Sequence, residues 1–113
     1  MPRTLAETLS PLEIPVRQHA YMRAWNQLTI VGRVIGFDPG YSEAVQLSCL
    51  KSLNEIQHRV WRAFYDPEGY APEDLVSEVR AHIREAPQLR GHVGSAFKRA
   101  IEQAEEWDKS SPR

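Results

Sequence analysis

Apolar residues at helical spacing constrain the fold of this chain more than any other feature of its sequence. The pattern is strongest over residues 42–64, where one stripe consists of Val45, Cys49, Leu53, Ile56, Val60 and Phe64. Positions three or four apart lie on the same face of an α-helix. Leu47, Leu50 and Trp61 widen the apolar face to about half of the helix circumference. We therefore expect residues 42–64 to form the central helix of the protein.

Three further segments show the same spacing and predict helices over residues 16–36, 75–86 and 88–108. Their stripes consist of Ala20, Tyr21, Ala24, Trp25, Leu28, Val31 and Ile35, then of Leu75, Val76, Val79 and Ile83, and finally of Leu89, Val93, Ala96, Phe97, Ala100, Ala104 and Trp107. Amphipathic helices with short connections are typical of a helical bundle. The sequence therefore predicts an all-α protein, a compact four-helix bundle.

Both ends of the chain are expected to lie outside this bundle. The first 15 residues contain three prolines, and Pro15 is expected to interrupt any helix that begins at the capping-box pair Ser10 and Glu13. We expect an irregular N-terminal arm over residues 1–15, a single helical domain over residues 16–109 and a frayed tail over residues 110–113.

The stretch LTIVGRVIGF, residues 28–37, fits two different structures. Its β-branched residues and two glycines are also typical of a strand, which would make the fold α+β. Continuity with the stripe before it favours a helix. In a helix, Ile30, Val34 and Phe37 lie off the main stripe and form a second apolar patch, which a monomeric bundle would have difficulty covering.

Two similar phrases, FDPGYSE at residues 37–43 and YDPEGYAPE at residues 65–73, separate the expected helices. Proline ends a helix, glycine adopts a positive φ, and aspartate or serine bonds the free amides of a helix start, so we interpret both phrases as turns. The alternative is one shared ligand site, made by Asp38, Tyr41, Asp66 and Tyr70. The two turns are held about 33 Å apart by the central helix, so such a site requires an antiparallel dimer.

Composition and charge exclude several classes of protein. The single cysteine excludes a disulfide within the chain and favours a reducing compartment. No basic start precedes an apolar run, and the longest apolar stretch is too short to span a membrane. The 14 basic and 15 acidic residues give a net charge of −1, without the broad basic field of a nucleic-acid-binding protein. We expect a cytoplasmic protein without membrane contact.

No motif in the sequence predicts catalysis, a cofactor or a metal. Glu78, His82 and Glu85 share one edge of a helix, where such residues usually form a solvated rim rather than a metal or proton-transfer site. The segment LRGHVGSAFKR, residues 89–99, lacks the spacing of a phosphate-binding loop. Cys49 lies between apolar neighbours and is interpreted as a core residue. An enzyme is therefore the less favoured interpretation.

Two glutamines, Gln46 and Gln57, fall within the broad apolar face of the central helix. A buried amide is costly unless hydrogen-bond partners are supplied, so these residues are expected to fix helix register or dimer pairing. The alternative is a ligand pocket, lined by Trp25, Gln46, Gln57 and Trp61.

Three hypotheses for the function follow. The favoured one is a small protein-interaction or regulatory module that self-associates as a homodimer, or binds another protein, through Ile30, Val34, Phe37, Leu47 and Trp61. The second is a helical bundle that binds a small molecule in the pocket with the two glutamines. The third is weak binding of nucleic acid by a basic segment, through Arg80, Arg84, Arg90, Lys98 and Arg99.

Overall fold

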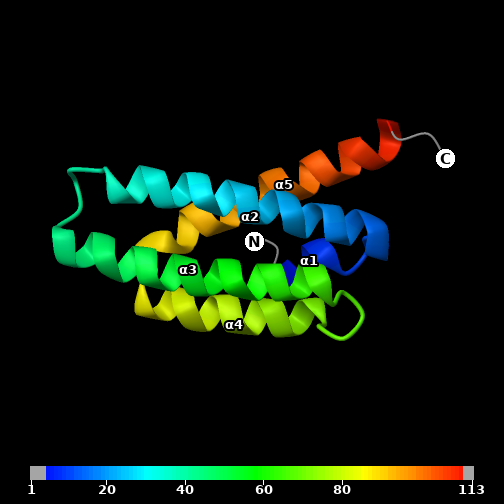
Figure 1. Cartoon of the computed structure of the whole chain (residues 1–113), viewed down its shortest axis with the longest axis horizontal. Coiled ribbons are helices and arrows are strands. Elements are labelled where there is room, and N and C mark those ends of the chain that lie inside the picture. The colour runs from blue at the N-terminus through cyan, green and yellow to red at the C-terminus, as the bar shows by residue number, and fades with distance from the viewer. Residues whose placement is uncertain (1–4, 111–113) are drawn as a thin grey trace.

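The computed structural model describes residues 5–110 and places nearly all of them in helices (Figure 1). The elements are α1 (Leu5–Leu9), α2 (Ile14–Gly36), α3 (Glu43–Tyr65), α4 (Pro72–Glu85), the short 3₁₀ helix η1 (Pro87–Leu89) and α5 (Arg90–Ser110). No strand occurs within residues 5–110. The all-α helical bundle is thus confirmed, and the α+β alternative for residues 28–37 is wrong because residues 28–36 continue α2 and Phe37 is its C-cap.

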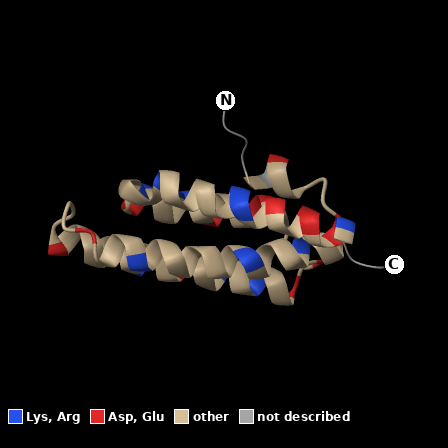
Figure 2. Cartoon of the chain, turned by 90° about the horizontal axis from the view of Figure 1, so that it is seen from above, with Lys and Arg blue, Asp and Glu red and all other residues tan. Residues whose placement is uncertain are grey.

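The helices form two layers. The antiparallel hairpin of α2 and α3 makes one layer, and α1, α4 and α5 make the other, as the view from above shows (Figure 2). Helix α5 packs on α2, α4 packs on α3, and α1 packs against α4 and touches α5. The hairpin is therefore covered on one side only.

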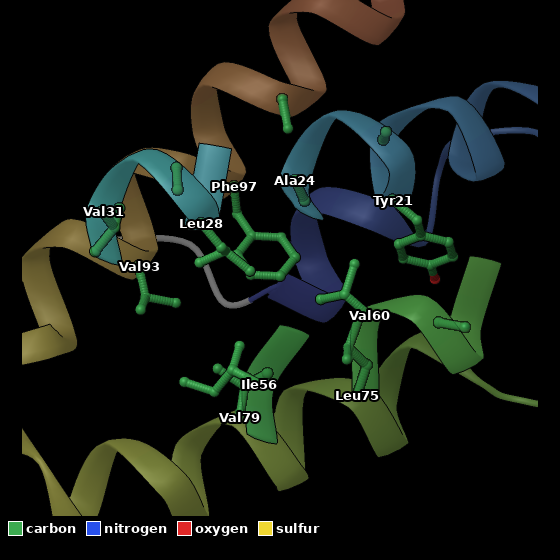
Figure 3. Packing of buried hydrophobic residues seen from close by; sticks show 14 of the residues in the cluster. Tyr21, Ala24, Leu28, Val31, Ile56, Val60, Leu75, Val79, Val93 and Phe97 are labelled. Atoms are coloured by element: carbon green, nitrogen blue, oxygen red, sulfur yellow. The ribbon is translucent and has the colours of Figure 1, made fainter. Parts of the chain in front are cut away.

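The core lies between these layers and is built from the predicted stripes. The buried side chains of the four long helices point toward one another in Figure 3, which labels Tyr21, Ala24, Leu28, Val31, Ile56, Val60, Leu75, Val79, Val93 and Phe97. Two tryptophans of the stripes, Trp25 and Trp107, are partly exposed instead. Each lies at the margin of its stripe, Trp25 beside α3 and Trp107 near the end of α5.

The N-terminal segment differs from the expected irregular arm. Residues 5–9 form α1, Leu9 is fully buried in the core, and α2 begins at Ile14, before the expected domain start at residue 16. Pro15 does not interrupt this helix, because the first turn of a helix needs no amide donor there. Residues 1–4 of the arm and 111–113 of the tail lie outside the described residues.

Each of the two Asp-Pro turns follows the end of one helix and precedes the start of the next, and the turns lie at opposite ends of α3 (Figure 1). The Asp38 carboxylate accepts a hydrogen bond from the Gly40 amide at 2.8 Å, and the Asp66 carboxylate accepts one from the Gly69 amide at 3.0 Å. Neither glycine has the expected positive φ. At Gly69 the missing Cβ matters instead, because a Cβ there would collide with the Asp66 carboxylate.

Candidate functional site

The uncovered side of the hairpin carries two lines of exposed or half-exposed side chains, which we call the hairpin face. On α2 and its C-cap the line is Met22, Asn26, Ile30, Val34 and Phe37, and on α3 it is Leu47, Leu50, Asn54, His58, Trp61 and Tyr65. Members of each line are three or four positions apart and so share one side of their helix. Outside these lines, the described residues with large exposed apolar side chains are Ile14, Trp25 and Trp107.

All five residues predicted to form an interface belong to the hairpin face. Their exposed fractions are 50% for Ile30, 50% for Val34, 85% for Phe37, 61% for Leu47 and 44% for Trp61. The prediction that the first three lie off the buried stripe of their helix agrees with these values. Helix α2 directs its buried stripe toward α3 and α5, so these three side chains have no helix of the described chain over them.

Aromatic side chains cluster at the end of the hairpin face that lies near the α3–α4 turn. The ring of Trp61 lies 5.9 Å from Trp25, 5.9 Å from Phe64 and 4.9 Å from Tyr65, measured between centroids. The contact with Tyr65 is edge to face, an arrangement that aromatic pairs prefer. This cluster holds the exposed rings in fixed positions, which lowers the entropy lost when a partner covers them.

The two glutamines form hydrogen bonds within the hairpin, Gln57 along its length and Gln46 at its turn. The amide of Gln57 donates hydrogen bonds to the Trp25 carbonyl at 3.1 Å and to the Thr29 hydroxyl at 2.8 Å. The amide of Gln46 donates to the Asp38 carbonyl at 2.8 Å. The Gln57 contacts join α3 to α2, whereas the Gln46 contact joins α3 to the α2–α3 turn; both side chains are half-buried, and a role in helix register or dimer pairing stays a prediction.

The residues of the predicted ligand pocket are only partly brought together. Trp25, Gln57 and Trp61 line an open depression of about 690 Å³. Its other lining residues are Asn54, Glu55, His58 and Arg59. Gln46 is eleven positions from Gln57 along α3, which is about 16 Å, and lies at the α2–α3 turn instead.

The predicted basic segment divides between two surfaces. Arg80, Arg84 and Arg90 line a second depression, between α4 and α5. Lys98 and Arg99 are exposed farther along α5. Nine positions separate Arg90 from Arg99, and this spacing puts them on opposite sides of the helix. Nucleic-acid binding by all five residues stays a prediction.

The residues considered for metal binding, proton transfer or nucleophilic chemistry lie in surroundings that favour structural roles. Within residues 5–110, no three His, Cys, Asp or Glu side chains are close enough to hold a metal ion. Glu78 forms an ion pair with Arg59 at 3.7 Å. Burial raises the pKa of the Cys49 thiol, which disfavours the nucleophilic thiolate.

Sequence reasoning missed one contact between distant parts of the chain. The rings of His19 on α2 and Trp107 on α5 stack, and Nε of Arg23 donates a hydrogen bond to Nε2 of His19 at 3.3 Å. Burial and the nearby Arg23 guanidinium both lower the pKa of His19. The sequence contains one signal for this arrangement: Arg23 follows His19 by four positions, which places the two side chains on the same side of a helix.

Comparison of this chain with models of protein families, with curated proteins and with solved structures finds no match. None of the helices in the described part of the chain combines the length and the apolar character needed to cross a membrane. The hairpin face remains the largest exposed apolar feature among the described residues.

Proposed function

We propose that the protein is a small cytoplasmic interaction module, without catalytic activity, that self-associates through the hairpin face. The observation that carries the proposal is the high exposure of Ile30, Val34, Phe37, Leu47 and Trp61 along one layer of the bundle. Removing a large apolar side chain from water contributes about 1.5–3 kcal/mol, so covering several of them drives association. The buried free thiol of Cys49 agrees with a reducing compartment.

The hairpin face has the size of a stable interface. Helices α2 and α3 each contain 23 residues and are therefore about 35 Å long and about 10 Å wide. Side by side they present roughly 35 by 20 Å, or about 700 Å². Specific protein interfaces commonly bury about 800 Å² on each partner.

The mainly apolar character of both lines of the hairpin face favours a second copy of the chain as the partner. None of the members of these lines is Lys, Arg, Asp or Glu, while Arg33 on α2 and Lys51 on α3, which have the same helical spacing, are exposed beside them. In a two-fold symmetric dimer each face meets itself, so a charge near the axis would meet its own copy and repel it. Two polar members of the lines, Asn26 and Asn54, carry no charge and therefore avoid this cost. Interface cores are likewise depleted of charged residues.

The variant Val34→Glu tests this proposal, because symmetry places two new carboxylates in each interface. We expect sedimentation velocity to show a shift from dimer toward monomer, with an unchanged helical circular dichroism spectrum since Val34 is exposed. The matched control is Ser95→Glu, which adds the same charge at an exposed position of α5. An unchanged sedimentation coefficient for Val34→Glu would remove this interface from consideration.

A second candidate function is binding of a small molecule at the depression with Trp25, Gln57 and Trp61. Its volume of about 690 Å³ falls within the usual range for ligand sites, and two tryptophans border it. A ligand there would alter tryptophan fluorescence, so a screen of metabolites that gives no concentration-dependent change would count against this candidate.

A further inference from the structure

A groove on the other layer of the bundle combines an apolar floor with three arginines. It has a volume of about 680 Å³ and lies between α4 and the start of α5. Its lining residues are Leu5, Val76, Val79, Arg80, Ile83, Arg84, Pro87, Arg90, Val93 and Gly94. None of them is part of the hairpin face.

The groove arises from the way in which α4 and α5 diverge. Helix α4 packs on α3 while α5 packs on α2, so the two helices separate after their connection at η1. Val79 and Val93 are buried at the base of the groove, and Ile83 is half-buried. The margin of the groove at Gly94 is open, since a Cβ added there would meet no atom within 4 Å.

The arginines of the groove form no ion pair with an acidic residue of the described range 5–110. Arg80 and Arg84 are one turn apart on α4, and Arg90 approaches from α5. All three are exposed, and no Asp or Glu lines the groove. Among residues 5–110, the structure gives none of the three a hydrogen bond or an ion pair through its side chain, whereas Arg59 pairs with Glu78. The groove therefore has a positive rim beside apolar surface.

We propose that this groove binds a small amphiphilic anion. Its carboxylate lies among the guanidinium groups of Arg80, Arg84 and Arg90, which are suited to bidentate hydrogen bonds with carboxylates. Its hydrocarbon body covers the half-buried side chains of Leu5 and Ile83. The segment of α4 from residue 76 to residue 84 is about 12 Å long, which accommodates a short alkyl chain rather than an extended polymer.

Octanoate is the probe that tests this site, with octanol as the neutral probe of the same chain length. We expect octanoate, added to the full chain below its micellar concentration, to shift backbone amide NMR signals of α4 and of the first turns of α5. Octanol should bind at least about ten-fold more weakly, because its hydroxyl carries no negative charge and cannot accept the paired hydrogen bonds that a carboxylate accepts from a guanidinium group. Added KCl should weaken the binding of octanoate and leave that of octanol unchanged.

Arginine variants separate this site from general attraction of anions. Arg84→Gln keeps a polar hydrogen-bonding side chain, although a shorter one, and should weaken octanoate binding about ten-fold, since it removes a charged donor. Arg99→Gln removes an exposed charge outside the groove and should leave binding unchanged. Equal affinity for octanol and octanoate, no amide shifts in the groove, or equal losses in the two variants would each overturn the proposal. These results are independent of dimer formation through the hairpin face.

Discussion

His19 and Trp107 join the two layers of the bundle, because their rings stack with centroids 4.5 Å apart and planes inclined by 22°. The contact ties the last turns of α5 to the first half of α2. It also depends on the charge of His19, whose Nε2 accepts a hydrogen bond from Arg23 only when the ring nitrogen is unprotonated.

We predict that the stability of the protein falls as the pH is lowered through the range in which His19 becomes protonated. Burial first, and the Arg23 charge second, lower the pKa of His19 below its ordinary value of 6.5. Its contribution to stability is therefore complete above pH 6.5 and is lost as the pH falls through the folded-state pKa. Thermal unfolding at several pH values checks this, with His19→Gln as the comparison. An identical pH dependence in both proteins would show that other groups are responsible.

The hydroxyl of Tyr21 is predicted to contribute nothing to stability. It is buried in the core and has no hydrogen-bond partner among the described residues. Burial is the main cause that raises the pKa of Tyr21 to about 12, while Arg17 lowers it and Glu73 raises it. Tyr21→Phe should therefore be neutral or stabilise the fold by about 1 kcal/mol, because an unpaired buried polar group is removed.

Chemical denaturation of the Tyr21 variants measures this effect. Tyr21→Ala is the comparison that removes the ring as well, and it should cost about 3–5 kcal/mol, as for large aromatic residues in a core. A clear loss of stability in Tyr21→Phe would show that a bound water or another group satisfies the hydroxyl.

We predict that Gln57 mainly stabilises the fold and contributes less to the binding of a ligand. Gln57→Ala removes hydrogen bonds to the Trp25 carbonyl and the Thr29 hydroxyl, and should reduce the free energy of unfolding by about 1–2 kcal/mol. Urea denaturation monitored by circular dichroism measures this loss. Unchanged stability would favour the ligand-binding interpretation of this glutamine instead.

The helices and most of the core could be predicted from the sequence, because each apolar stripe depends only on the spacing of residues within one helix. Residues 28–37 were ambiguous because β-branched side chains occur in helices and strands alike, and their neighbours in space decide between the two. The spacing of Leu5, Leu9 and Leu12 indicates that the N-terminal segment packs on the core. The prolines in this segment led to the prediction of an irregular arm instead. Pro15 was misjudged because its position within the helix, rather than its presence, determines its effect.

The candidate sites were less predictable, because they depend on which helices become neighbours. The exposure of Val34 and Phe37 followed from one helix alone, whereas the partners of Gln57 required the pairing of α2 with α3. Arg80 and Arg84 were identified as members of a basic segment. Their position beside Arg90 and an apolar floor required the divergence of α4 from α5.

The solution mass of the protein tests the central claim most directly. Light scattering coupled to size exclusion, over a wide range of protein concentration, should give a mass near twice the 13.0 kDa of one chain. Dilution should lower this mass, and Val34→Glu should lower it at concentrations where the unaltered chain is dimeric. A constant mass of 13.0 kDa at every concentration would contradict self-association through the hairpin face.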